Sequence, residues 1–255
     1  MGGDTQILAI LNLLKAAVSE NEYTYYHLLS GSDLPLTSQE NIHSFFEQNK
    51  GKEFLTFSGM GTDSKLYDRV RYTYHFSKLT HRITNNKWLQ KVIRLYRKID
   101  LKVQKLQKVD RWKKENPNKQ LKYGSQWFSI THELVLYILE NEQWIEKSFK
   151  DTYLCDELFV HTLVYNSKFY EHVYNFHPVK DIPNEQQGNL RYINWWDGSP
   201  YTWSLSSQED LLQLNQGIEL GHLFSRKFNL THQEINEIRR NLFETAINSD
   251  SSSLS

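Results

Sequence analysis

Two adjacent carboxylates, Asp156 and Glu157, are the residues of this sequence best suited to chemistry. The apolar residues that follow them recur at helical spacing, which predicts a helix with both acids in its first turn. A carboxylate fixed near the positive end of a helix dipole can serve as a general base. The plainer alternative is that the two acids only favour the start of the helix. The apolar residues are Phe159, Val160, Leu163 and Val164.

The composition of the 255-residue chain narrows the function classes. Thirty Lys and Arg residues balance thirty Asp and Glu residues, so we expect no nucleic-acid partner. The single cysteine, Cys155, excludes an internal disulfide framework and a Cys-based zinc cluster. No apolar run is long enough to span a bilayer, and no signal peptide is visible. We therefore expect a cytoplasmic protein, with the inner face of the membrane as a second possible location.

The first part of the chain alternates helix and strand patterns, which predicts a parallel α/β layer. Residues 7–18 form an amphipathic helix pattern, and residues 23–29 and 53–58 read as buried strands. A capping box at residues 37–40 opens a helix that ends near Gly51. The loop at residues 30–35 follows a strand, so Ser32 and Asp33 are candidates for lining a ligand site. The alternative is an ordinary polar turn.

The next part is strongly basic. Residues 69–75 alternate like a strand that displays Arg69 and Arg71 on one face. Residues 87–114 keep apolar positions at a three-four spacing, which predicts one long helix or two, and the other face is mostly Lys and Arg. That face could contact anionic lipid headgroups as a peripheral membrane surface. A solvated helix face is the commoner explanation.

From residue 123 onward, the sequence contains shorter patterns that predict secondary structure. Residues 123–129 predict a turn that runs into a strand, Thr131 caps a helix over 132–140, and Gly124 would allow a ligand or another backbone to approach closely. Residues 190–200 predict a strand followed by a turn. A capping box at 231–234 begins a closing helix, and the Ser-rich tail 248–255 is predicted to be disordered. We find no linker, so one domain is expected over residues 1–247.

Six motifs, taken together and in order, resemble the core-2/I-branching β-1,6-N-acetylglucosaminyltransferase family, glycosyltransferase family 14, which includes xylosyltransferases. Each motif alone would be weak evidence, but they extend over nearly the whole chain. The motifs are Gly2 and Gly3 with the helix after them, residues 27–36 (HLLSGSDLPL), 123–128 (YGSQWF), 151–157 (DTYLCDE), 190–195 (LRYINW) with 198–200 (GSP), and 222–228 (HLFSRKF).

The resemblance implies an α/β fold of the glycosyltransferase A type, with a mixed central sheet flanked by helices. It implies an inverting transfer of a sugar, N-acetylglucosamine by analogy, from a UDP-sugar to a glycan or lipid-linked oligosaccharide acceptor. Glu157 matches the family's catalytic base, and Arg191 and Lys227 match the basic residues directed at the diphosphate. Cations placed there would stabilise the leaving group without a metal, so we expect no cofactor and no metal site. Residues assigned to substrate binding are Ser32, Asp33, Arg69, Gly124, Ser125, Gln126, Trp127 and Asp156.

The chain departs from the family pattern at its start. Family members carry a strand-helix-strand unit, which holds the uridine, before the Gly2 and Gly3 segment, so we expect this first unit to be missing. Two alternatives follow: a non-catalytic remnant that binds glycans or a partner, and a xylosyltransferase of the same family. A glycosidase is disfavoured because adjacent helical residues point about 100° apart, whereas hydrolysis needs two carboxyl groups facing each other across the bond.

Overall fold

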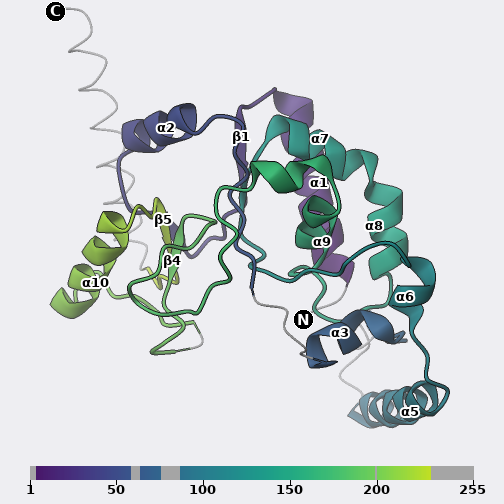
Figure 1. Cartoon of the computed structure of the whole chain (residues 1–255). Coiled ribbons are helices and arrows are strands. Elements are labelled where there is room, and N and C mark those ends of the chain that lie inside the picture. Colours follow the sequence, from purple (N-terminus) through teal and green to yellow (C-terminus); the bar gives the residue numbers. More distant parts are fainter. Residues whose placement is uncertain (1–3, 59–63, 76–86, 199, 231–255) are drawn as a thin grey trace, which may run out of the picture. The chain divides into compact units, whose positions relative to one another are not determined.

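The computed structural model describes residues 4–58, 64–75, 87–198 and 200–230, which form two compact units (Figure 1). Unit 1 is built from Met1–His27 and Gly51–Val179, and unit 2 from Leu28–Lys50 and Lys180–Ser255. The chain thus enters each unit twice. The single domain predicted over residues 1–247 stays a prediction, and the predicted closing helix and tail lie outside the described residues.

Unit 1 is mainly helical. Its first helix, α1 (Asp4–Glu20), packs against α7 (His132–Glu140) and α8 (Glu142–Phe149) through a buried stripe that includes Ile7 and Leu11. The predicted helices over 7–18 and 132–140 are confirmed, because in both the apolar period and the burial agree. The other helices in the described residues of unit 1 are α3 (Ser64–Arg71), α5 (Lys87–Leu106), α6 (Arg111–Glu115), α9 (Phe159–Tyr165) and the 3-10 helix η1 (Lys168–His172).

The strands of unit 1 are short. β1 (Tyr25–His27) pairs antiparallel with β3 (Ser129–Thr131). The predicted strand at residues 53–58 is represented by isolated bridges to partners on two sides, Phe54 with Ser129 and Glu53 with Val173. Because its partners change along its length, this segment forms no continuous ladder.

Unit 2 contains a three-stranded sheet in the order β2 (Asp33–Pro35), β5 (Phe224–Arg226), β4 (Arg191–Ile193). β5 is antiparallel to β2 and parallel to β4, so this small sheet is mixed, whereas the mixed central sheet flanked by helices stays a prediction. The parallel layer predicted for the first part of the chain is wrong for β1, which pairs antiparallel with β3. Two helices, α2 (Gln39–Gln48) and α10 (Gln208–Glu219), belong to the same unit. Its core contains Tyr192, Trp203, Leu214 and Phe228.

Two of the predicted elements are wrong. Residues 33–35, predicted as loop, form strand β2 because β5 offers them a partner. Residues 69–71, predicted to begin a strand, end helix α3 instead. There the Arg71 guanidinium lies 4.8 Å from the centre of the Tyr67 ring and 3.4 Å from an Asp68 oxygen. Contacts three and four residues apart form on one helix face and cannot form along a strand.

The helix caps largely follow the sequence. Thr131 caps α7 as predicted, its hydroxyl accepting from the Leu134 amide at 3.2 Å. In α2 the cap is Ser38, one residue later than the first residue of the predicted capping box, and it accepts from the Asn41 amide at 3.3 Å. The region 87–114 forms two helices, since Lys108 adopts a positive φ of 53° before Asp110 caps α6.

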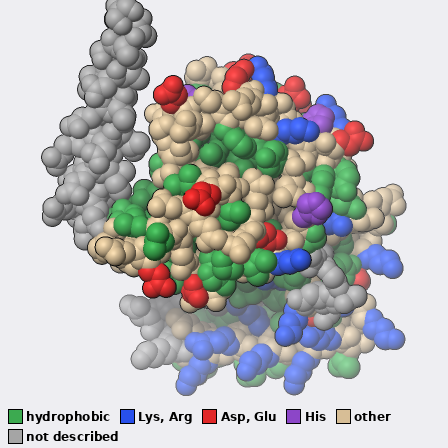
Figure 2. All heavy atoms as spheres, turned by 60° about the vertical axis from the view of Figure 1, so that its left-hand side comes forward, with side chains coloured by type: hydrophobic (Ala, Val, Ile, Leu, Met, Phe, Trp, Pro, Cys, Tyr) green, Lys and Arg blue, Asp and Glu red, His purple; other side chains and the backbone are tan. Residues whose placement is uncertain are grey.

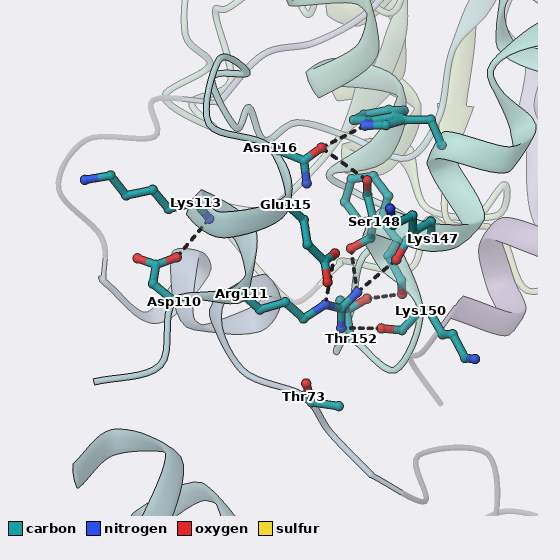
Figure 3. Close-up of polar contacts among 12 residues, drawn as sticks. Thr73, Asp110, Arg111, Lys113, Glu115, Asn116, Lys147, Ser148, Lys150 and Thr152 are labelled. Carbon is teal, nitrogen blue, oxygen red and sulfur yellow. Dashed lines mark hydrogen bonds and ion pairs between the residues drawn. The ribbon is translucent and has the colours of Figure 1, made fainter. Parts of the chain in front are cut away.

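Hydrogen bonds connect the α6 segment to the C-terminal end of α8 (Figure 3). The Arg111 guanidinium donates to the backbone carbonyls of Lys147, Ser148 and Lys150 at 3.0, 3.0 and 2.6 Å. A cation at a helix C-terminus satisfies carbonyls that lack a partner in the helix. Asn116 adds a second connection to α8, since its side-chain oxygen accepts a hydrogen bond from the Trp144 indole at 2.7 Å.

Candidate active site

Asp156 and Glu157 lie in a turn that precedes α9. The Cys155 carbonyl accepts from the amides of Leu158 and Phe159 at 3.0 and 3.3 Å, and the helix begins only at Phe159. The predicted position of both acids in the first helical turn is therefore wrong. Cys155, Leu158 and Phe159 are fully buried, so the apolar anchors of the turn hold the acids in place.

The Glu157 carboxylate is fixed by Arg69. Nη1 of Arg69 donates to Oε2 of Glu157 at 2.8 Å and to the Leu154 carbonyl at 3.2 Å. The guanidinium also lies 5.6 Å from the centre of the Tyr123 ring. The Glu157 side chain remains 32% exposed. This carboxylate is thus oriented by a cation while solvent, and hence a substrate, can still reach it.

The motif at residues 123–127 lies against the same turn. The Gly124 amide donates to the backbone carbonyl of Glu157 at 3.0 Å, and the Ser125 amide donates to the Thr56 carbonyl at 3.1 Å. A Cβ on Gly124 would fall 2.0 Å from the Thr56 oxygen and 2.4 Å from Nε2 of His161. The close approach predicted for Gly124 is confirmed, and the partners are a backbone and a side chain of the protein itself.

The rest of this motif is partly buried. Ser125, Gln126 and Trp127 all have intermediate exposure, and the Trp127 amide donates to the Ser125 hydroxyl at 3.3 Å. Arg69, Glu157 and the 123–127 motif therefore meet in unit 1, although they are far apart in the sequence. Their roles toward substrate stay predictions.

Asp156 and His161 flank this arrangement as buried groups. Burial, and then the neighbouring Glu157 charge, raise the pKa of Asp156. Burial lowers the pKa of His161 to about 4, so its imidazole is neutral near pH 7. Asp156 lies beneath the surface rather than beside Glu157 in solvent, which makes it less suited to contact a substrate directly.

In unit 2, Asp33 is held entirely by the protein. Its carboxylate accepts from the Ser30 amide at 2.9 Å and the Ser30 hydroxyl at 2.7 Å, and it pairs with Nε of Arg226 at 3.3 Å. Its side chain is fully buried. Sequence reasoning proposed Asp33 as a substrate contact but missed Arg226, whose position beside Lys227 in one basic motif was the available signal.

Arg191 is also buried. Its guanidinium donates to the backbone carbonyls of Asn189 and, at 3.3 Å, Leu28, and lies 4.9 Å from the centre of the Phe224 ring. Burial lowers the pKa of Arg191 to about 9 and the Asp33 charge opposes that shift, so the group carries its charge at neutral pH. From this buried position the Arg191 charge can act on a nearby anion electrostatically, without a direct contact.

Lys227 occupies a different environment, at a cavity of about 450 Å³ in unit 2. The Phe228 amide donates to the Ser32 carbonyl at 2.9 Å, which joins the two predicted donor-site segments at the cavity wall. The Lys227 side chain is exposed. An ammonium group and hydroxyls around one cavity are suited to an anionic ligand. The lining comprises Gly31, Ser32, Thr202, Lys227, Phe228, Asn229 and Leu230.

Within the described residues, no group of three or more His, Cys, Asp or Glu side chains is placed to hold a metal ion. Unit 1 contains a partly exposed carboxylate–arginine pair, and unit 2 separately contains a cavity lined by the Lys227 ammonium group.

Comparison with known proteins identifies the family to which this chain belongs. The family model for the Core-2/I-Branching enzyme matches residues 1–214, and the chain belongs to that family. The resemblance predicted from the six motifs is confirmed. The chain is also similar to Xylosyltransferase sqv-6 of Caenorhabditis briggsae, with 26% identity over 178 residues. That similarity covers 68% of this chain and 17% of the relative, so the chain spans less than a fifth of that relative's length.

Proposed function

We propose that this chain is an inverting glycosyltransferase that moves a sugar from a UDP-sugar to a hydroxyl of a glycan acceptor, with Glu157 as the general base. Family membership supports the reaction class. The observation that carries the residue assignment is the Glu157 carboxylate, which is oriented by Arg69 at 2.8 Å and still 32% exposed. A base must be both positioned and reachable.

The proposed step is a single displacement. The acceptor oxygen forms a bond to the anomeric carbon of the donor sugar while Glu157 takes the proton of that hydroxyl. The bond from the anomeric carbon to the diphosphate oxygen breaks, and its electron pair leaves with UDP. Attack opposite to the leaving group inverts the anomeric centre. Among the described residues, the Glu157 carboxylate accepts a hydrogen bond from Arg69 at Oε2, which leaves Oε1 for the acceptor.

Unit 2 supplies the groups proposed for the diphosphate. Lys227 would contact it directly in the cavity that Ser32 and Thr202 also line. Arg191 would add positive charge from its buried position, since its own hydrogen bonds go to backbone carbonyls. Cations in place before the reaction stabilise the charge that develops on UDP, and for this reason we propose a metal-independent reaction.

The donor sugar has two candidates. N-acetylglucosamine follows from the family resemblance, and xylose is favoured by the similarity to a xylosyltransferase. The glycosyltransferase A-type fold and the cytoplasmic location stay predictions.

The test is UDP release from UDP-N-acetylglucosamine and from UDP-xylose, with and without EDTA, in the presence of glycan acceptors. We expect turnover with one donor that EDTA does not abolish. Glu157→Gln should lower kcat by about 10²- to 10⁴-fold, while calorimetry shows unchanged UDP binding. Glu140→Gln, an exposed acid at the end of α7, is the matched control.

Three outcomes would revise the proposal. Turnover by Glu157→Gln equal to that of Glu140→Gln would remove the base assignment. Loss of activity in EDTA that added Mg²⁺ restores would contradict metal independence. Glycan binding without UDP binding or turnover in the unaltered chain would favour a non-catalytic binding protein.

A further inference from the structure

The apolar side of α5 faces solvent, although its spacing is that of a core-facing helix. Trp88 is 70% exposed, Ile99 54% and Leu106 83%. On a helix of 3.6 residues per turn, seven such residues fall within a sector about 100° wide. All seven are exposed in the structure, and we call them the apolar stripe: Trp88, Val92, Leu95, Tyr96, Ile99, Val103 and Leu106.

Polar anchors on the other side of α5 hold the helix in this orientation. The Gln104 side chain donates to the Thr73 carbonyl and accepts from the Thr73 amide, both at 2.9 Å. Nε of Arg97 donates to the His75 carbonyl at 3.1 Å. Gln104 is buried and points about a third of a turn away from the centre of the apolar stripe. The outward direction of the stripe is therefore set by specific bonds.

A row of cations borders the apolar stripe. Lys91, Arg94, Lys98 and Lys102 follow one another along one edge of it, and all four are exposed. Figure 2 shows Lys and Arg side chains gathered at the lower edge of the view, where α5 lies in Figure 1. The one acid of α5, Asp100, accepts from Gln104 at 2.7 Å on the anchored side. We call the four cations the basic row.

We infer that α5 docks in the interfacial region of an anionic lipid bilayer, with its apolar stripe in the headgroup–acyl boundary and its basic row on lipid phosphates. An exposed apolar face edged by Lys and Arg is the pattern of helices that lie in the plane of a membrane. A helix of 20 residues is about 30 Å long. No helix in the described part of the chain is long and apolar enough to cross a bilayer.

Charge complementarity selects the lipid surface over a second copy of this chain. In a symmetric dimer with antiparallel helices, pairing two stripes would place both basic rows on the same side, where like charges repel. With parallel helices the rows would lie on opposite sides, and neither would gain a counter-charge from the other row. An anionic lipid surface offers the apolar stripe and the basic row their complements at the same time. Arg111 is not part of this surface, because its guanidinium donates hydrogen bonds to the carbonyls at the end of α8 (Figure 3).

The experiment measures binding of the full chain to 100-nm vesicles of phosphatidylcholine alone and of phosphatidylcholine with phosphatidylglycerol. We expect the chain to sediment with the anionic vesicles. We also expect a blue shift of Trp emission that Trp88→Phe removes. Lys91→Gln, Lys98→Gln and Lys102→Gln combined should weaken binding to anionic vesicles by about 10²-fold or more, since each cation near such a surface strengthens binding.

Leu95→Ser with Ile99→Ser should weaken binding by a similar factor because both side chains leave water on docking. The matched control is Leu211→Ser with Leu212→Ser on α10, which also exposes two leucines but carries no Lys or Arg. All altered residues are exposed, so thermal unfolding should be unchanged and will show that each variant folds.

Two results would overturn the inference. The first is absence of vesicle binding by the unaltered chain. The second is binding that Leu95→Ser with Ile99→Ser leaves as strong as the α10 control does. A concentration-dependent dimer that dissociates in the Leu95 and Ile99 variant, with no vesicle binding, would identify the stripe as a contact between copies of the chain instead.

Discussion

Two of the carboxylate–arginine pairs in the described residues, Asp33 with Arg226 and Glu157 with Arg69, use the same groups in different environments. In unit 2, the Asp33 side chain is fully buried, pairs with Arg226 at 3.3 Å and accepts two more hydrogen bonds from Ser30. In unit 1, the Glu157 side chain is 32% exposed and pairs with Arg69 at 2.8 Å. Both acids stand in motifs shared with glycosyltransferases. Their environments suit the first to holding the fold and the second to chemistry.

The difference follows from desolvation. A buried carboxylate must have all its partners within the protein, because an uncompensated buried charge is costly. A half-exposed carboxylate keeps water as a partner and can exchange that water for a substrate hydroxyl. Site residues read from a motif therefore need the burial of each side chain before a role in contact with substrate is assigned.

The largest expected effect is on stability at Asp33. Asp33→Ala should lower the free energy of unfolding by about 3–5 kcal/mol, because Arg226 and the nearby Arg191 lose their buried counter-charge. Glu157→Ala should lower the free energy of unfolding by about 1 kcal/mol or less, as expected for a pair that solvent partly screens. Urea unfolding followed by circular dichroism measures both, and Glu219→Ala on the exposed side of α10 is the control. Equal losses at the two sites would show that burial does not separate the two pairs in stability.

Another buried carboxyl, that of Glu53, tests the same rule with Thr131 rather than an arginine as its hydrogen-bond partner. It accepts from the Thr131 amide at 3.0 Å and the Thr131 hydroxyl at 2.6 Å. Burial raises the pKa of Glu53 from 4.5 to about 7. The folded state therefore binds the extra proton, and the stability it contributes is fully present below pH 4.5 and is lost as the pH rises through 7.

We expect unfolding measured in urea between pH 4.5 and pH 8 to show a fall of roughly 3 kcal/mol from this group, and Glu53→Gln to remove that fall. The neutral amide matches the protonated acid in shape. A Glu53→Gln variant with the same pH dependence as the unaltered chain would show that this carboxyl is ionised in the folded state.

Arg69 is expected to act as a positioning residue for Glu157. Arg69→Met should lower kcat by about 10- to 100-fold, since loss of a fixed geometry costs that much, and should change KM far less. Arg69→Lys should restore part of the rate because a cation remains at Oε2. A fall caused only by weaker donor binding, seen as a raised KM with an unchanged kcat, would contradict this role.

The smallest expected effect is the coupling of Arg69 and Glu157 in stability. A double-mutant cycle with Arg69→Met and Glu157→Gln, measured by thermal unfolding, should give about 0.2–1 kcal/mol. This value should shrink in high salt because the pair is partly exposed. A coupling as large as that of a buried pair would show that the Glu157 pair stabilises the fold in the same way as the Asp33 pair.

Several features were predictable from local sequence alone. The helices α1 and α7 were found from apolar period, and the Thr131 cap and the β4 strand from local signals. Gly124 was recognised as a place of close approach, because only the smallest residue tolerates a backbone at 2.0 Å from a Cβ position. The family was recognisable because six ordered motifs are present in the chain.

Other features were decided by tertiary contacts. The 69–75 pattern fits either a strand or a helix, and contacts of Arg71 with Tyr67 and Asp68 accompany the helix. Asp33 and Lys227 looked alike as candidate ligands, but β5 buries the first and leaves the second at a cavity. The stripe of α5 is apolar by sequence, yet the contacts of Gln104 with Thr73 and of Arg97 with His75 turn it to solvent. Periodicity defines which residues share a face, whereas burial depends on what the rest of the chain places against that face.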